Sequence, residues 1–183
     1  MTFRINDITG ALRSGGARPT LFNVNVTNPV NGAGDEAMQF LCETAQLPGS
    51  TIGPIEVPYF GRKIKLAGDR TFEAWTVTII NDEDFAIRNA MEAWHSAING
   101  LTNNLRNFPS ASPSEYKSAA QVIQYGKTGD LLREYSFVGL FPTEISTIDL
   151  DWGSTDTIEK FTVTFQYDYY ELTRGSTLDG TVA

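Results

Sequence analysis

Groups that commonly carry out chemistry are scarce in this chain of 183 residues, which contains one cysteine, Cys42, and one histidine, His95. A single cysteine cannot form an intrachain disulfide, and one thiol with one imidazole cannot supply a structural zinc site. The sequence has neither the Gly-x-Ser-x-Gly turn of a hydrolase nor a phosphate-binding Gly-x-x-x-x-Gly-Lys-Ser/Thr loop. We therefore predict no catalysis, no metal and no cofactor, with Cys42 packed and His95 on a helix flank or an interface.

Long apolar runs and positive charge are also scarce. No stretch is long enough to cross a membrane as a helix, and the first sixteen residues lack the apolar region of a signal peptide. The 22 acidic residues outnumber the 14 basic ones, which gives a net charge of −8. Such a surface repels phosphate, so the chain is not expected to bind nucleic acid, although nucleic acid could still pass along it.

Short segments of alternating apolar and polar residues make up much of the chain. The clearest is 161–169, where Phe161, Val163 and Phe165 alternate with threonine and glutamine. This period predicts antiparallel strands with one buried and one wet face. Further strands are expected over 22–27, 75–79 and 147–152, with weaker candidates at 38–43, 62–66, 119–125 and 135–140. These roughly eight strands predict a mainly β, antiparallel sandwich or half-barrel in one domain.

One flanking helix is predicted over 82–98, because Ile87, Met91, Trp94 and Ile98 recur at spacings of four, three and four. Asn81 or Asp82 would cap its start, Glu83 and Asp84 would favour its dipole, and Asp84 would pair with Arg88. Its acidic start is therefore interpreted as helix capping rather than as a metal site.

Two groups of residues leave alternatives open. Asp149 and Asp151 lie on one face of a predicted strand, where they could bind a cation, but a solvated face is the favoured interpretation. The aromatic residues of the last strand, with Trp75, Trp94 and Trp152, are expected in the core, although a lipocalin-like ligand-binding barrel is a rival explanation.

The segment 46–58 combines three prolines and two glycines with Ile52, Ile55 and Val57. Proline and glycine disfavour regular pairing while the apolar side chains favour burial. We therefore expect an irregular loop that folds over a neighbour, within the subunit or across an interface.

The block GRKIKLAGDRTFEAWTVTIINDE, residues 61–83, closely resembles the tail-tube proteins of contractile-tailed bacteriophages. ARPTLFNVNV (17–26) resembles the first strand of that family and its lead-in. The later strands are resembled, in the same order, by SEYKSAAQVIQY (114–125), GLFPTEISTIDLDW (139–152) and EKFTVTFQYDYYE (159–171). The likeness covers a core of 17–171 and leaves 1–16 as an N-terminal arm and 172–183 as a tail.

The resemblance implies a structural virion protein that forms a hexameric ring with a continuous β-barrel lumen. Rings would stack into a tube, assembled in the host cytoplasm, through which DNA passes without specific binding. The implied partners are the sheath protein, the baseplate tube-initiator, the tape-measure protein and the tail terminator, with no membrane. The related alternatives are the tube protein of a contractile injection or type VI secretion apparatus, or the baseplate protein that initiates a tube.

The loop 47–59 is the candidate for ring stacking, because the resemblance places inter-subunit contacts there. Its candidate contact residues are Leu47, Pro48, Ile52, Ile55, Val57 and Tyr59. Charges around a predicted hairpin between 62–66 and 75–79 would either pair across protomers or keep the turn soluble. These charged residues are Arg62, Lys63, Lys65, Asp69 and Arg70.

Overall fold

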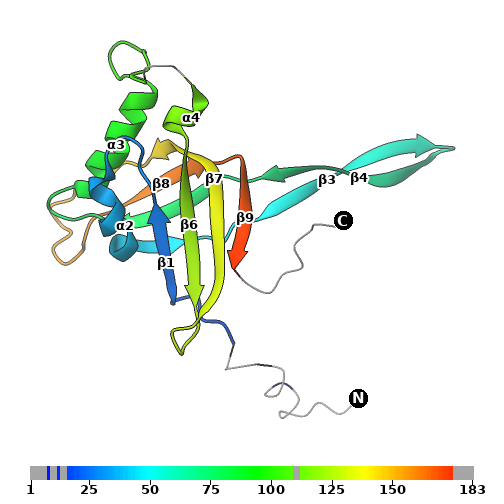
Figure 1. Cartoon of the computed structure of the whole chain (residues 1–183), viewed down its shortest axis with the longest axis horizontal. Helices are drawn as coiled ribbons and strands as arrows, with labels where there is room; N and C mark the ends of the chain where they lie inside the picture. The colour runs from blue at the N-terminus through cyan, green and yellow to red at the C-terminus, as the bar shows by residue number, and fades with distance from the viewer. Residues whose placement is uncertain (1–7, 9–11, 13–15, 109–111, 175–183) are drawn as a thin grey trace.

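The computed structural model describes residues 8, 12, 16–108 and 112–174, which form a seven-stranded antiparallel sheet, a separate two-stranded hairpin and a few helices (Figure 1). Most of the predicted N-terminal arm and residues 175–183 lie outside the described residues. The strands are β1 (Phe22–Val26), β2 (Cys42–Ala45), β3 (Ser50–Tyr59), β4 (Arg62–Phe72), β5 (Trp75–Ile80), β6 (Ser118–Tyr125), β7 (Leu131–Ile145), β8 (Lys160–Gln166) and β9 (Tyr169–Arg174). The helices are α2 (Asp35–Leu41), α3 (Ala86–Ile98) and α4 (Pro113–Tyr116), with a 3₁₀ turn at Gly32–Gly34.

The large sheet has the strand order β1-β6-β7-β8-β5-β2, and β9 also pairs with β7. The long strand β7 joins two halves, because its first part pairs with β6 and β9 while its last residues pair with β8. At Tyr167 and Asp168 the chain passes from β8, in one half of the sheet, to β9, in the other half. The predicted strand 161–169 is therefore two strands, and the mainly antiparallel β class is confirmed.

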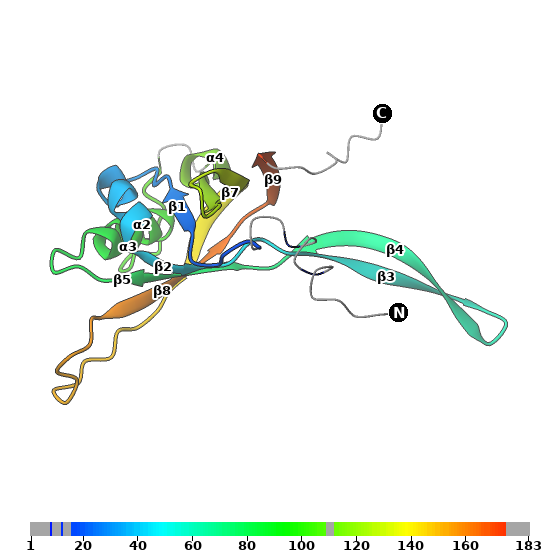
Figure 2. The ribbon, with the colours of Figure 1, turned by 90° about the horizontal axis from the view of Figure 1, so that it is seen from below.

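The core lies between the concave side of the sheet and helices α2 and α3, which cover that side (Figure 2). The alternating positions of β5 and β8 supply six of its buried residues, and Trp75 stacks on Phe137 with ring centroids 4.5 Å apart. Trp94 of α3 is also fully buried, and its Nε1 donates to the Tyr116 carbonyl. The periodic strands and the one amphipathic helix therefore bury the side chains that their patterns predict.

Helix α3 begins at Ala86, four residues later than predicted. Asp82 still acts at this end, because its Oδ1 accepts a hydrogen bond from the Ala86 amide at 3.1 Å. The residue before the helix is Phe85, whose φ of 53° lies in the left-handed region. Arg88 pairs with Glu92 at 2.8 Å instead of the predicted Asp84.

Two strand predictions are wrong. Residues 38–43 lie mostly in α2, because this amphipathic turn buries Met38 while leaving Phe40 82% exposed, and only Cys42 and Glu43 are extended. Residues 147–152 form no strand, although apolar and polar residues alternate there, since β7 leaves the sheet after Ile145. Trp152 is consequently fully exposed rather than part of the core. The alternation of apolar and polar residues does not by itself show whether another element covers the apolar side chains.

The predicted irregular loop 46–58 is wrong for most of its length, because Ser50 onward forms strand β3. Two prolines lie in this strand, which is compatible with a ribbon that has no third strand beside it. The hairpin predicted between 62–66 and 75–79 is also wrong. β4 pairs with β3, and the turn lies at Phe60 and Gly61.

Candidate functional site

The hairpin β3–β4 projects from the body of the molecule as a long two-stranded ribbon (Figures 1 and 2). Its register runs from Ser50 opposite Phe72 at the base to Tyr59 opposite Arg62 at the tip. Phe72 anchors the base, because its ring packs against Tyr167 and Tyr170 with centroids 5.9 and 5.5 Å away. Beyond that base every side chain of β3 is exposed.

The two faces of this ribbon differ in chemistry. Directly opposed residues point to the same side, so the pairs Ile55–Leu66 and Val57–Ile64 form one apolar face. These four side chains are 41–53% exposed. The opposite face carries the pair Glu56–Lys65 and also Lys63, which forms an ion pair of 2.6 Å with Glu56. The hairpin is therefore amphipathic, yet nothing among the described residues covers its apolar face.

The tip of the hairpin is a two-residue turn with both central residues at positive φ, 45° for Phe60 and 76° for Gly61. Such turns favour asparagine followed by glycine, so a phenylalanine at the first position strains the backbone. Phe60 is 90% exposed, and its ring meets the edge of Tyr59 with centroids 4.6 Å apart. An exposed aromatic pair thus occupies the most distant point of the ribbon.

The predicted stacking and charge residues fall into two groups. Leu47 and Pro48 precede β3 beside the main sheet, where Leu47 lines a small hollow with Phe22 and Val122. The remaining residues lie on the ribbon itself. From base to tip these are Ile52, Ile55, Val57 and Tyr59 on β3, and Arg70, Asp69, Lys65, Lys63 and Arg62 on β4. The structure therefore brings most of them together on one projecting element.

The face of the large sheet that points away from the helices carries rows of polar residues, with one apolar row of Ala119, Val138 and Tyr169 beside them. In one half, the register aligns Asn25, Gln121, Ser136 and Glu171 across four strands. In the other half it places Thr76 opposite Thr164, and Thr78 opposite Thr162. One face of the sheet therefore packs against the helices, and the other face points away from them.

The residues considered for chemistry are not arranged as a reactive site. Cys42 is half-buried, its thiol donates to the Thr44 carbonyl oxygen, and burial raises the pKa of the Cys42 thiol to about 12. His95 is exposed on α3, and Asp149 and Asp151 are exposed in the loop after β7. In the described part of the chain, no three His, Cys, Asp or Glu side chains group closely enough to hold a metal ion, and no helix could span a membrane.

The loop 146–159 between β7 and β8 is a second exposed apolar surface that the sequence reasoning missed. Leu150, Trp152 and Ile158 are between 68% and 102% exposed there. The signal that would have revealed it is the combination of these large apolar residues with acidic residues and turn formers. The alternation of residues 147–152 alone predicts a half-buried strand there instead.

A family model described as "Phage tail tube protein" matches residues 17–173. The chain belongs to the phage tail tube protein family. The tail tube protein gp19 of Enterobacteria phage T4 is 37% identical over 169 residues, which cover 91% of this chain and 99% of that protein. The tail tube protein of Serratia phage KSP90 is 29% identical over 168 residues, which cover 89% and 93% of the two chains.

Solved structures share the fold of this tail tube family member at low sequence identity. One chain from an extracellular contractile injection system, the PVC sheath–tube complex in its extended state, has a TM-score of 0.58 and 15% identity. The match covers 93% of this chain and 98% of that chain. The chain is accordingly a structural virion protein of the tail tube, and family membership decides against the ligand-binding barrel as its function.

Proposed function

We propose that six copies of this chain form a ring whose sheets join into one continuous β-barrel, and that stacked rings form the inner tube of a contractile tail. DNA would pass through the lumen during ejection without specific binding. The observation that carries this proposal is the uncovered apolar face of the hairpin β3–β4. A lone two-stranded ribbon is marginally stable in water, so a regular apolar face on it calls for a partner.

The hairpin is the proposed contact between successive rings. Its length carries Ile55, Val57, Ile64 and Leu66 away from the body of their own subunit (Figure 2). A neighbouring copy that covered this face would remove apolar surface from water, at about 25 cal/mol for each Å² buried. The charged residues of the other face would either pair across protomers or keep the ribbon soluble before assembly.

The polar face of the large sheet is the proposed wall of the lumen. Helices α2 and α3 cover the opposite face, so this is the face left for a channel. Gln121 and Ser136 offer water-binding groups without positive charge, and Glu171 at the end of their row repels phosphate. Joining the open edges of neighbouring sheets would also remove unpaired strand edges that favour aggregation.

The proposed partners follow from a tube inside a contractile tail. They are the sheath protein, the baseplate protein that initiates the tube, the tape-measure protein and the tail terminator. A phage tube fits the matched family better than the tube protein of an injection or type VI secretion apparatus, because the family and the curated relatives are phage tail tube proteins.

Electron microscopy of the purified protein, with two matched variants, tests this function. Ile64→Ser removes an apolar side chain from the uncovered face, whereas Ala67→Ser changes an exposed residue that pairs with Pro54 on the other face. Wild-type protein should form rings and tubes, Ile64→Ser should yield folded subunits without tubes, and Ala67→Ser should assemble. Uniform small particles from the wild type at every concentration would contradict the proposal.

A further inference from the structure

The loop 146–159 forms an open hollow of about 450 Å³ between its two arms. It lies at the end of the molecule opposite to the hairpin tip (Figure 2). Ile148, Leu150, Trp152 and Ile158 contribute apolar surface to this hollow, and Trp152 is fully exposed. A hollow of this size is large enough to accept an aromatic side chain with its neighbours.

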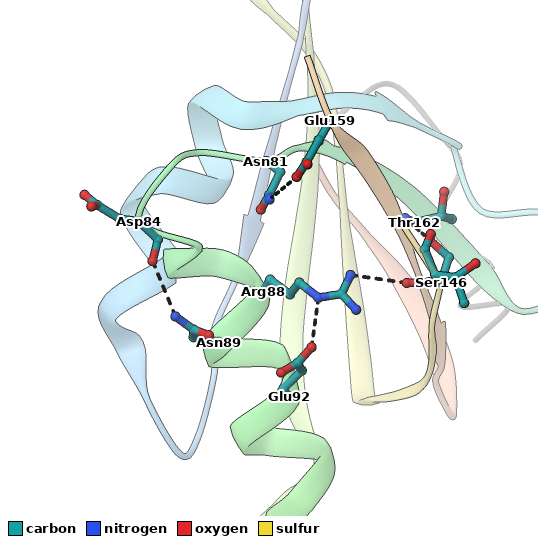
Figure 3. Close-up of polar contacts among 9 residues, drawn as sticks. Asn81, Asp84, Arg88, Asn89, Glu92, Ser146, Glu159 and Thr162 are labelled. Atoms are coloured by element: carbon teal, nitrogen blue, oxygen red, sulfur yellow. Dashed lines mark hydrogen bonds and ion pairs between the residues drawn. The ribbon is translucent and has the colours of Figure 1, made fainter. Parts of the chain in front are cut away.

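Both ends of this loop are fixed by polar contacts (Figure 3). At the first end, Ser146 accepts at its carbonyl oxygen from Arg88 Nη1 at 3.2 Å, and its Oγ accepts from the Thr162 amide at 2.8 Å. At the second end, Glu159 Oε2 accepts from Asn81 Nδ2 at 3.1 Å. The exposed apolar residues therefore stand on a base held by α3, β8 and the residue that follows β5, which favours a preformed docking surface.

The loop and the hairpin tip carry opposite charge. The loop contains Asp149, Asp151, Asp156 and Glu159 and no lysine or arginine. Around the tip, Arg62, Lys63 and Lys65 outnumber the single acid Glu56, in a chain whose net charge is −8. The ion pair at the tip joins Lys63 to Glu56. Among the described residues, no acidic group lies within ion-pair distance of Arg62.

We propose that the hollow of the loop 146–159 receives the hairpin tip of a second copy of this chain. Tyr59 and Phe60 would pack on Leu150, Trp152 and Ile158, while the basic residues of the tip face the acidic residues of the loop. The proposal rests on the tube function proposed above, and it names the surface that accepts the stacking hairpin.

This contact is head-to-tail, because the tip and the hollow lie at opposite ends of one molecule (Figure 2). Each copy presents its tip to one neighbour and its hollow to another. Heterologous contacts of this kind either close into a ring or continue from copy to copy, and both outcomes suit a stacked tube. The strained backbone at Phe60 fits the same scheme, since strain of this type is commonly retained at functional positions.

A charge-exchange experiment tests the pairing. Arg62→Glu reverses one charge at the tip, and Asp149→Arg reverses one in the loop, where no hydrogen bond uses the Asp149 carboxylate among the described residues. Each variant alone repels further copies of itself and should associate at least about tenfold more weakly than wild type. A mixture of the two should associate, because each variant's tip then meets an oppositely charged hollow. Sedimentation velocity and electron microscopy measure the assembly.

Lys127→Glu, in the turn between β6 and β7, makes the same change of charge as Arg62→Glu away from both surfaces and should assemble like wild type. Wild-type assembly together with equal assembly of Asp149→Arg would overturn the docking surface while leaving the tube function intact. A mixture that fails to associate would overturn it as well. A wild-type protein that never associates would overturn both proposals.

Tryptophan fluorescence gives a second readout that does not depend on charge. Trp75 and Trp94 are buried, whereas Trp152 is fully exposed in the subunit. Assembly should shift the emission to the blue and reduce acrylamide quenching, and the difference from a Trp152→Phe variant assigns the change. An unshifted, fully quenchable Trp152 in assembled tubes would contradict the proposal.

Discussion

Lys117 Nζ lies 2.7 Å from both carboxylate oxygens of Asp168, and this ion pair closes the corner where the chain leaves β8 and enters β9. The Asp168 amide also donates to the Val138 carbonyl oxygen at 3.0 Å. Beside them, Gly139 has a φ of 71°, and a side chain there would collide with the Asp168 carboxylate. Strands β7, β8 and β9, which link the two halves of the sheet, therefore meet around the ion pair between Lys117 and Asp168.

Gly139→Ala should destabilise the fold by about 2 to 3 kcal/mol, because displacement of the Asp168 carboxylate adds to the cost of a left-handed backbone. Gly129→Ala is the matched control. Gly129 has a similar φ of 84° but open space where the side chain would lie, so its cost should be about 1 kcal/mol. Chemical denaturation measures both free energies of unfolding.

A protein that already carries Asp168→Ala separates the cost of the left-handed backbone at 139 from the cost of the collision with the Asp168 carboxylate. Removing the carboxylate removes the atoms that an alanine at 139 would strike first. In that background the cost of Gly139→Ala should fall toward that of Gly129→Ala, measured against Asp168→Ala itself. An unchanged cost would mean that the backbone conformation, and not Asp168, makes glycine necessary at 139.

Phe60→Asn should stabilise the isolated subunit and weaken assembly. Asparagine tolerates the left-handed conformation at this turn position, so the strain of about 1 kcal/mol is relieved. Phe60 is 90% exposed in the subunit, which loses little packing when the ring is removed. Thermal unfolding of the subunit and sedimentation of tubes measure the two effects. Stabilised subunits with unimpaired tubes would show that the phenylalanine serves no contact.

The Cys42 thiol should react slowly in the folded protein. Burial raises its pKa from 9.0 to about 12, so at neutral pH the reactive thiolate is roughly a thousandfold scarcer than in a free cysteine. Iodoacetamide labelling followed by mass spectrometry measures the rate, with the denatured protein as the control. Equal rates in folded and denatured protein would contradict the assigned burial.

The raised pKa of Cys42 also makes the stability of the folded protein depend on pH. The folded state holds the thiol proton more tightly than the unfolded state, so this stabilisation is fully present below pH 9.0 and is lost as the pH rises toward about 12. Cys42→Ala should therefore lose less stability than wild type over that alkaline range. Denaturation midpoints across the range provide the comparison.

The sequence predicts the parts of this fold that bury their own side chains. Trp75, Val77 and Ile79 alternate in β5 and lie in the core, as Ile87, Met91 and Trp94 do on α3. The errors lie where apolar residues stay exposed in the subunit, as at Ile55 on the hairpin and Leu150 in the loop 146–159. Prolines and glycines suggested a loop at the hairpin, because local propensity does not reveal that β4 pairs with it. The surfaces proposed for assembly follow neither the pattern of a core nor that of a solvated loop.

Glu171→Lys should slow DNA passage through assembled tubes. Glu171 ends the polar row with Asn25, Gln121 and Ser136, on the sheet face proposed to line the lumen. A lysine there would attract phosphate in every subunit of the tube, so the moving duplex would adhere to the wall, most strongly at low salt. Glu83→Lys makes the same change of charge at an exposed position before α3 and should leave passage unaffected. The rate of DNA ejection from virions carrying each variant is the measurement, and equal rates for the two variants would place Glu171 outside the lumen.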